Sequence, residues 1–536
     1  MAPFGIVDAH GSWTLTRYHG ILLYTQLAAR ELTDCGFVPR VHLLMRFFLT
    51  IAVALTAARG AWRGATRAPP AHRRRAAAPR LGWMEDAAAL QAAKGRASKE
   101  LTLVAWLEEN GVHMNELAGW GRAAHPMRVE AETVDDFEPS GRGLLARKQI
   151  SQGEAVLQIN TRLCLTKERA QEVLGRSVVP DALGEYLAIA LLLIHERAKG
   201  ASSFWAPYVD ILPTTEEVGQ SFTWADDELA LLQGSAVVDS TESMQRKLRS
   251  EYAALQATTL AQHPALSAEV YSWEAFEWAM SMLFSRAINL REIDALALVP
   301  YADLLNHSPY SQSYFLVNSV PLSNQKEVAL YADRAYARND QIFISYGQKS
   351  NAELLLLYGF VVDRNLYDEV ELTVALGDDD ALYAEKRAFL ERQGLKTKMA
   401  FPLLIDRYSS ELVQFLRLCC AQPSDLPLEG LKYNERISPQ NERAALGALI
   451  AGCEQALAEY PESEAEDAAM MDNARLFAAL TRNQRMAVKL RRNEKRILER
   501  TIRVCETTLQ DIERELSRPA SVGGAGPPGL PRIVAR

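Results

Sequence analysis

The sequence predicts an α+β protein in which a β-rich half with a helical insert is followed by a helical C-terminal half. Three observations predict this class. Three short strand-like segments lie between residues 313 and 346, and the last of them alternates polar and apolar residues. Residues 167–279 and 366–516 instead carry apolar residues at helical spacing. At 536 residues, the chain is long enough for two or three domains and a large core.

Each of these elements has local signals. The strands are expected at Ser313–Asn318, Glu327–Ala332 and Gln341–Tyr346, with turn residues Asn339 and Asp340 before the last one. A helix is expected after Gly347, because Ser350 is a good N-cap residue and Glu353 completes a capping box ahead of four leucines. Gly359 stands where a helix C-terminus favours a left-handed residue.

Four short motifs follow one another in this region. They are Asp303-Leu304-Leu305-Asn306-His307, Ile344-Ser345-Tyr346-Gly347, Ser350-Asn351-Ala352-Glu353 and Tyr358-Gly359-Phe360. The Asn306-His307 pair ends an apolar segment, so both side chains need hydrogen-bond partners if they are buried. Taken singly, such residues are more often packed core residues than functional ones. Together, the four motifs resemble the SET-domain methyltransferases, and most closely the Rubisco large-subunit lysine methyltransferase branch.

The resemblance implies a SET-domain β-fold, S-adenosyl-L-methionine as cofactor, and a set of site residues. It makes Tyr346 the catalytic residue, which would hold the methyl group and the acceptor amine in line. It assigns the cofactor to Ser140, Gly141, Arg142, Arg286, Asp303, Asn306, His307, Tyr346, Tyr358, Gly359 and Phe360. Many relatives carry Glu where this chain has Ser140, so the contact to the polar end of the cofactor is expected to differ. Methyl transfer requires positioning and a deprotonated amine, and no metal is expected.

One arginine and one basic run also have a purely structural interpretation. Arg286 ends an aromatic-rich helical stretch, where an arginine usually faces solvent; the resemblance places it beside the cofactor carboxylate, which suits a guanidinium. The run Arg482–Arg500 is expected to be mainly solvated, with exposed members adding docking surface for the protein substrate. It belongs to a segment that resembles the helical substrate-binding domain of the same branch. A four-three apolar repeat from Leu498 to Leu516 predicts a helix packing seam there.

The expected domain organisation has five parts. They are a leader over 1–84, a helical lead-in over 85–129, a SET domain over 130–365 with its helical insert at about 167–279, an all-α substrate-binding domain over 366–516, and a disordered tail over 517–536.

The leader has the composition of a targeting segment. Residues 35–84 contain nine arginines and no acidic residue, and Phe47–Ala57 is an apolar run too short to span a bilayer comfortably. A signal core followed by such a segment resembles the two-part leader of algae with complex plastids. The alternatives are a membrane anchor or a disordered basic tail. Met45 is a second candidate start.

Composition argues against several classes of function. A net charge of −8 is not that of a general nucleic-acid-binding protein. The six cysteines include no C-x-x-C pair and no histidine at ligand spacing, which argues against structural zinc and against a secreted disulfide framework.

The predicted function is S-adenosylmethionine-dependent protein-lysine N-methylation of a non-histone plastid protein. The expected partner is the Rubisco large subunit or another stromal protein, with no nucleic acid and no stable membrane association after leader removal. The expected location is the chloroplast stroma, and otherwise the cytoplasm. Two alternatives remain: a protein-histidine methyltransferase of the same family, and a catalytically idle SET-domain binding platform. The presence of Asn306, His307 and Tyr346 favours an active enzyme.

Overall fold

The computed structural model describes residues 99–114, 125–135, 138–320, 323–425 and 434–517. The predicted leader, the predicted tail after residue 517 and part of the predicted lead-in therefore lie outside the described residues. The described chain begins with a helix over residues 99–109. Within the described ranges, no helix is long and apolar enough to cross a membrane.

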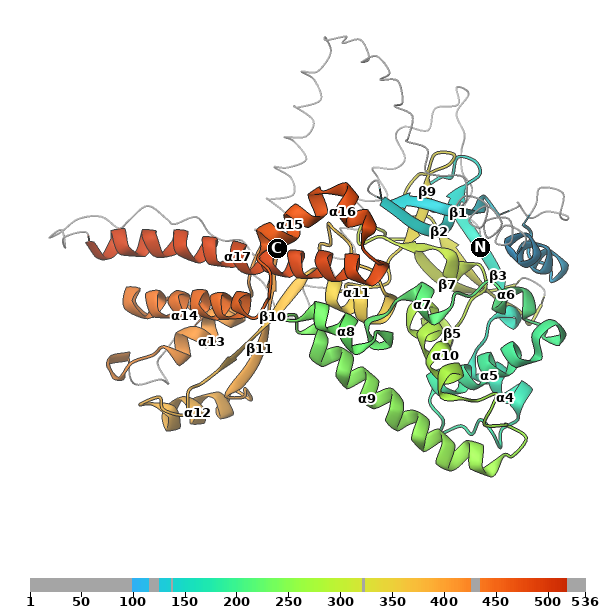
Figure 1. The fold of residues 1–536 in the computed structure, drawn as a ribbon, viewed down its shortest axis with the longest axis horizontal. Helices are drawn as coiled ribbons and strands as arrows, with labels where there is room; N and C mark the ends of the chain where they lie inside the picture. The colour runs from blue at the N-terminus through green and yellow to red at the C-terminus, as the bar shows by residue number, and fades with distance from the viewer. Residues whose placement is uncertain (1–98, 115–124, 136–137, 321–322, 426–433, 518–536) are drawn as a thin grey trace, which may run out of the picture. The chain divides into compact units, whose positions relative to one another are not determined.

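The N-terminal half is built on small β-sheets (Figure 1). Its strands are β1 (Met127–Asp135), β2 (Glu138–Ala146), β3 (Ala155–Asn160), β4 (Ile288–Leu290), β5 (Ala295–Ala297), β6 (Asn306–His307), β7 (Tyr314–Ser319), β8 (Lys326–Tyr331) and β9 (Gln341–Ile344). One sheet has the order β1-β2-β9-β6, a second has the order β3-β8-β7, and β4 pairs with β5. The three strands predicted between residues 313 and 346 are confirmed as β7, β8 and β9.

The pairing of β6 with β9 brings two of the sequence motifs together. These strands run parallel, with Asn306 opposite Phe343 and His307 opposite Ile344. Because the strands point the same way, the residues that follow β9 emerge beside the end of β6. This register places Tyr346 next to His307.

The chain between β3 and β4 forms the helical insert. Its helices are α4 (Lys167–Leu174), α5 (Glu185–Lys199), α6 (Ala206–Val209), α7 (Thr215–Val218), α8 (Asp226–Leu229), α9 (Val237–Leu255) and α10 (Trp273–Arg286). Thr166, Thr214 and Ser272 cap α4, α7 and α10 by accepting the backbone N–H three positions later. The middle of α5, Ala188–Ile194, is buried on every side and lies in the main hydrophobic core. The insert is thus part of the core, and α10 ends at Arg286.

The helix after β9 is α11 (Asn351–Tyr358), and both of its predicted ends are confirmed. Ser350 accepts from the backbone N–H of Glu353, whose side chain accepts in turn from the backbone N–H of Ser350. Gly359 follows the helix in the left-handed region, with φ of 75°. A Cβ on Gly359 would lie 2.7 Å from the carbonyl carbon of Gly219 and 2.9 Å from the nitrogen of Gln220. Backbone conformation and a close approach to the insert both require glycine here.

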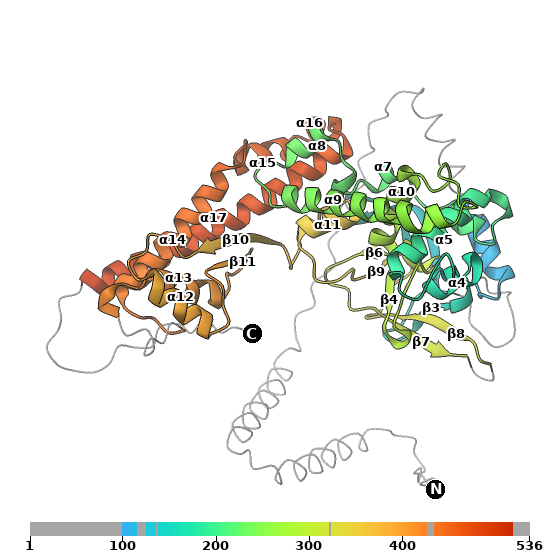
Figure 2. The ribbon, with the colours of Figure 1, turned by 90° about the horizontal axis from the view of Figure 1, so that it is seen from below.

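The C-terminal half is mainly helical and has its own hydrophobic core. Its helices are α12 (Tyr383–Arg392), α13 (Ser410–Cys419), α14 (Pro439–Ala458), α15 (Glu464–Asp472), α16 (Ala474–Ala479) and α17 (Arg482–Ser517). It also contains an antiparallel pair, β10 (Glu369–Ala375) with β11 (Lys398–Leu404), which the expectation of an all-α domain did not include. The 36-residue helix α17 packs along α14 and α15 (Figures 1 and 2). The predicted seam is confirmed: Leu498, Cys505 and Ile512 are buried in this core.

The predicted solvation of the basic run Arg482–Arg500 is wrong for three of its members. Lys489, Arg491 and Lys495 are only 3%, 6% and 1% exposed. Two other members, Arg496 and Arg500, do face solvent.

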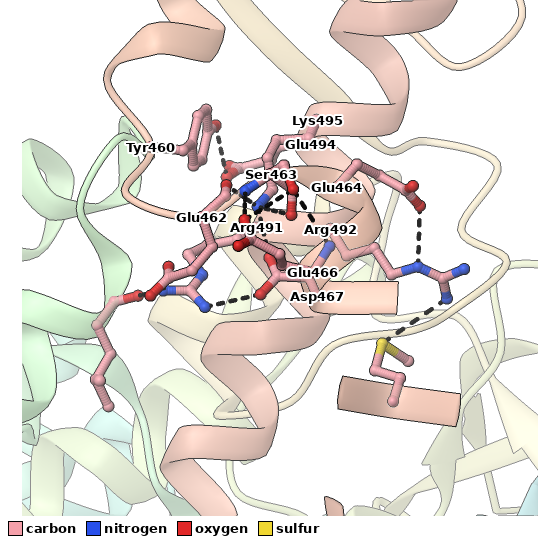
Figure 3. A network of polar contacts seen from close by, with 12 residues as sticks. Tyr460, Glu462, Ser463, Glu464, Glu466, Asp467, Arg491, Arg492, Glu494 and Lys495 are labelled. Carbon is pink, nitrogen blue, oxygen red and sulfur yellow. Dashed lines mark hydrogen bonds and ion pairs between the residues drawn. The ribbon is translucent and has the colours of Figure 1, made fainter. Parts of the chain in front are cut away.

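Figure 3 shows what compensates two of the buried charges. Asp467 of α15 lies 2.9 Å from Nη2 of Arg491 and 2.6 Å from Nζ of Lys495. The same Nζ donates to the backbone carbonyls of Glu462 and Ser463, and Glu462 also pairs with Arg491 at 2.8 Å. The acidic segment around α15 thus neutralises Arg491 and Lys495, whose burial without partners would be very costly.

Candidate active site

Tyr346 lies two residues beyond β9 with its hydroxyl directed at the protein backbone. The hydroxyl donates to the carbonyl oxygen of Leu305 at 2.7 Å, just before β6. Burial raises the pKa of the Tyr346 hydroxyl, so the group stays protonated at neutral pH. Its oxygen keeps lone pairs that this hydrogen bond does not use.

His307 holds the backbone of Tyr346. Its Nδ1 accepts the backbone N–H of Tyr346 at 3.0 Å, so the neutral ring carries its hydrogen on Nε2. Burial lowers the pKa of His307 to about 4, and the ring is therefore neutral at physiological pH. The two rings stack with centroids 5.1 Å apart. His307 thus positions the segment that follows β9.

Three aromatic side chains, Tyr346, Tyr358 and Phe360, form what we call the aromatic wall. The rings of Tyr346 and Tyr358 stack at 4.8 Å, and Phe360 meets them edge-on at 6.3 and 6.2 Å. Phe360 also lies 6.1 Å from the ring of His307. Burial raises the pKa of Tyr358 to about 12, so this hydroxyl also stays protonated. The wall thus offers apolar ring surface and two uncharged hydroxyl groups.

A second group of predicted residues meets around Asp303. The Asp303 carboxylate is buried and accepts from the hydroxyl of Tyr208 at 2.8 Å. Arg286 lies 3.6 Å from the same carboxylate oxygen and donates to the backbone carbonyl of Asp303 at 2.9 Å. Burial raises the pKa of Asp303, although Arg286 opposes the shift. Arg286 is therefore not the surface residue that its sequence context alone suggests.

Arg142 approaches the same group from β2. It donates to the carbonyl of Ile211 at 2.8 Å and lies 3.7 Å from the carboxylate of Glu100. Burial lowers the pKa of Arg142, and the charge of Arg286 adds to that effect. The carboxylates of Glu100 and Asp303 thus lie beside the two arginines and oppose this lowering.

The glycine-rich turn of β2 packs against Asn306. Gly141 has φ of 70°, a left-handed conformation that suits glycine. A Cβ on Gly143 would lie 2.6 Å from Oε1 of Gln341 and 2.7 Å from Nδ2 of Asn306, so a side chain would displace that amide. The Asn306 amide donates to Gln341 at 2.7 Å and to the hydroxyl of Thr133 at 3.2 Å. Ser140 also lies in β2, but its side chain is outside the described residues.

The predicted residues thus gather in two adjoining groups. Arg142, Arg286 and Asp303 form a charged group, while His307 and the aromatic wall form a neutral one. The hydroxyl of Tyr346 donates to the carbonyl of Leu305, two positions after Asp303, which links the groups. Sequence reasoning missed the side chains that hold these residues in place, namely Tyr208, Thr133 and Gln341. None of them belongs to a motif, so no local pattern indicates them.

Two family models match this chain. A SET domain model matches residues 141–347, and a Rubisco LSMT substrate-binding model matches residues 377–498. The crystal structure of the SET domain of LSMT bound to lysine and AdoHcy shares the fold, with a TM-score of 0.62 and 26% sequence identity. That match covers 78% of this chain and 93% of the other. The chain belongs to the SET-domain protein methyltransferases, in their Rubisco methyltransferase-like branch.

Relatives of this SET methyltransferase transfer methyl groups to two kinds of acceptor. The chloroplastic Rubisco large subunit N-methyltransferase of Nicotiana tabacum is 28% identical over 393 residues, which are 70% of this chain and 77% of that protein. The actin-histidine N-methyltransferase of Mus musculus is 27% identical over 473 residues, which are 81% and 75%. The two similarities are nearly equal, so they do not distinguish a lysine acceptor from a histidine acceptor.

The methyl donor of this SET methyltransferase is S-adenosylmethionine, and the charged group of the site fits it. Related structures contain Rubisco LSMT bound to AdoMet. In this chain Nε of Arg286 and Oδ1 of Asp303 are buried without a hydrogen-bond partner among the described residues. A cationic donor and a carboxylate oxygen complement the carboxylate and ammonium groups at the amino-acid end of the cofactor. No cluster of metal-ligating side chains occurs in the described ranges.

Proposed function

We propose that this enzyme methylates the ε-amine of a lysine in a plastid protein. The observation that carries the proposal is the aromatic wall beside neutral His307. The wall offers apolar ring surface, and the hydroxyl of Tyr346 is already engaged by the carbonyl of Leu305. The aliphatic part of a lysine suits such a surface. Desolvation there lowers the pKa of the amine below its ordinary value of about 10.4, as nucleophilic attack requires.

In this proposal Tyr346 is the catalytic residue and does not act as the base. The cofactor supplies a methyl group activated on a sulfonium. The raised pKa of Tyr346 and its hydrogen bond to Leu305 keep the hydroxyl protonated, while its free lone pairs can accept weak C–H···O contacts. His307 holds the backbone from which the ring projects. Positioning of the amine and the methyl group in line is thus the main contribution of the chain.

The remaining site residues divide between the two ends of the cofactor. We assign Arg286 and Asp303 to the amino-acid end, together with the turn that carries Ser140, Gly141 and Arg142. We assign Asn306 and His307 to the adenosine half, through backbone and side-chain groups. Tyr358, Gly359 and Phe360 enclose the acceptor channel and the cofactor.

Replacing Arg286 with glutamine is expected to weaken S-adenosylmethionine binding by roughly 10- to 100-fold. A hydrogen bond to a charged group contributes about 1.5–3 kcal/mol, and the variant loses the cation that would pair with the cofactor carboxylate. Isothermal titration calorimetry measures the change. Arg291→Gln is a matched control, because Arg291 is exposed on the segment that follows β4. An unchanged dissociation constant in Arg286→Gln would remove Arg286 from the cofactor site.

Histidine is the second candidate acceptor, favoured by the similarity to actin-histidine N-methyltransferases. A neutral imidazole needs no deprotonation, but its second ring nitrogen requires a hydrogen-bond partner that orients it. The side chains of Asn306 and His307 already have partners within the chain, and this favours lysine. A catalytically idle platform is the third candidate, and the intact set of site residues argues against it.

The deciding experiment uses the full chain with labelled S-adenosylmethionine. Acceptors are a plastid extract, purified Rubisco and actin, and mass spectrometry locates the methyl group. Methyl-lysine in a plastid protein supports the proposal. Methyl-histidine supports the second candidate. Tight cofactor binding with no transfer to any acceptor supports the platform.

We further propose that the protein acts in the plastid stroma. Two of its similar relatives are chloroplastic enzymes, and the Arg-rich, acid-free leader composition agrees with import. A fusion of residues 1–84 to a fluorescent protein is expected to enter the plastid and lose the leader. A reporter that stays in the cytoplasm would contradict this location.

A cavity next to α17 is the proposed docking place for a segment of the protein substrate. It has a volume of about 220 Å³ and is lined by Tyr310, Leu366, Asn493 and Arg496, among others. Tyr310 and Leu366 are exposed apolar side chains, and Nδ2 of Asn493 is buried without a partner among the described residues. Tyr310 follows His307 by three positions, so part of the cavity lining belongs to the segment that directly follows the active-site residue His307. An acidic side chain of the substrate would pair with Arg496.

Arg496→Glu is therefore expected to raise KM for the protein substrate roughly 3- to 10-fold, with kcat and cofactor affinity unchanged. Loss of uniform binding affects KM alone, and one exposed charge pair contributes up to about 1 kcal/mol. Steady-state kinetics on the natural substrate measures this. Arg514→Glu is the matched control, since it reverses an exposed charge about 27 Å along the same helix. A fall in kcat with constant KM would contradict the docking role.

A further inference from the structure

Arg482, the first residue of α17, belongs to the C-terminal half but binds the N-terminal half. Its Nη2 donates to the carbonyl of Gly359 at 3.0 Å. Its Nη1 donates to the carbonyl of Glu217 at 2.9 Å and also to that of Val218. The side chain is half-buried, and burial lowers its pKa. All three of these hydrogen bonds go to main-chain carbonyls, so the Arg482 guanidinium binds one particular arrangement of the backbone.

Gly359 is the residue at which α11 ends. The last carbonyls of a helix lack intrahelical partners and carry partial negative charge, so a cation there is favourable. Arg482 supplies that cation from a distant part of the sequence. Gln220 of the insert donates a hydrogen bond to the carbonyl of Leu357, two positions earlier, and is itself held by Ser281 of α10. The end of α11 is thus held by side chains from two other segments.

The contact between this helix end and the insert leaves no free space. A Cβ on Gly359 would meet the backbone of Val218, Gly219 and Gln220. Arg482 binds carbonyls on both sides of that contact, Val218 on one side and Gly359 on the other. It therefore clamps the two turns together.

The two neighbours of Gly359 are Tyr358 and Phe360, which form the aromatic wall with Tyr346. A displacement of Gly359 moves both rings relative to Tyr346, from which they now lie 4.8 and 6.3 Å away. Small displacements of groups around a reacting centre are costly, since a misplacement of about 1 Å can lower a rate 100-fold.

We propose that Arg482 is a positioning residue for methyl transfer, through which the C-terminal domain sets the geometry of the aromatic wall. The inference rests on the proposed function, because it assigns the wall to the acceptor. It gives the C-terminal domain a second task besides docking. Tyr358 and Phe360 would keep their distances from the ring of Tyr346 only while α17 stays in contact with the insert.

Other contacts also hold the C-terminal domain against the helical insert. Asn483 donates to the carboxylate of Glu228 at 2.9 Å, and Ser235 donates to that of Glu494 at 2.7 Å. Removal of the Arg482 guanidinium therefore leaves α17 attached to the insert. Asn483→Ala is the matched control, because it deletes a contact from the neighbouring residue to the same insert without touching the end of α11.

The test compares Arg482→Met, Arg482→Lys and Asn483→Ala in the full chain. Arg482→Met is expected to lower kcat roughly 10- to 30-fold, with KM for S-adenosylmethionine within twofold of wild type. Arg482→Lys should recover part of the loss, because an ammonium keeps the charge at the helix end but cannot span both turns. Asn483→Ala should keep wild-type kcat. Equal losses in the Asn483 and Arg482 variants, or a wild-type kcat in Arg482→Met, would overturn the proposal.

A second measurement does not depend on the acceptor. The ring protons of His307 feel the stacked ring of Tyr346 at 5.1 Å and that of Phe360 at 6.1 Å. In a histidine-labelled sample, the His307 resonance is expected to shift in Arg482→Met and to stay in place in Asn483→Ala. If the wild type methylates no lysine but the resonance shifts, the positioning role stands and the proposed acceptor fails. If the wild type methylates lysine and the resonance does not move, the positioning role fails.

Discussion

Replacing Tyr346 with phenylalanine is expected to lower kcat by roughly two to three orders of magnitude, with S-adenosylmethionine affinity near the wild-type value. The variant keeps the ring, and with it the stacking on Tyr358 at 4.8 Å and on His307 at 5.1 Å. It removes the oxygen that we assign to the methyl group and the amine, and loss of one transition-state contact has an effect of this size. Loss of the hydrogen bond to the buried carbonyl of Leu305 is expected to lower stability by about 1–3 kcal/mol.

Single-turnover kinetics with labelled cofactor measures the chemical step, and calorimetry measures cofactor affinity. Tyr252→Phe is the matched control. The hydroxyl of Tyr252 also donates to a backbone carbonyl, that of Tyr271 at 2.9 Å, but it lies on α9 outside the site. A Tyr346→Phe enzyme with wild-type turnover would show that Tyr346 only packs. A loss of the same size in both variants would point to a general effect on stability.

Replacing Asp467 with alanine is expected to destabilise the C-terminal domain by about 3–5 kcal/mol. The carboxylate lies between Arg491 and Lys495, and all three side chains are at least nine-tenths buried. Its removal leaves two buried cations with fewer counter-charges, which is the most costly way to break an ion pair. The carbonyls that bind Lys495 remain, but they cannot neutralise it.

Hydrogen exchange of α17 and the loss of helical circular dichroism in urea measure this change. No tryptophan follows Trp278, so tryptophan fluorescence reports on the N-terminal half instead. Glu464→Ala is the matched control: Glu464 pairs with Arg492 at 3.1 Å, but both side chains are partly exposed. Such pairs contribute about 0–1 kcal/mol. Equal stability of the two variants would mean that the Asp467 network makes no net contribution.

Much of the site was predictable because its residues act through short motifs. The strand at 341–344, the capping box of Ser350 and Glu353, and the glycine at 359 follow from local backbone preferences, which a few neighbouring residues decide. The order of the motifs then indicated the family. Long-range partners are different, because Tyr208 reaches Asp303 across 95 positions and Thr133 reaches Asn306 across 173. No periodicity or turn signal carries that information.

The sequence by itself determined the fold class, both ends of α11 and the residues that meet around Tyr346. Only the tertiary structure decided what surrounds α17. A run of lysines and arginines suggests a solvated surface, because burial of an isolated charge is prohibitive. Folding supplies Asp467 to the middle of that run and three backbone carbonyls to Arg482 at its start. Helix periodicity defines the faces of α17, but the groups that cover each face come from distant segments that only folding brings together.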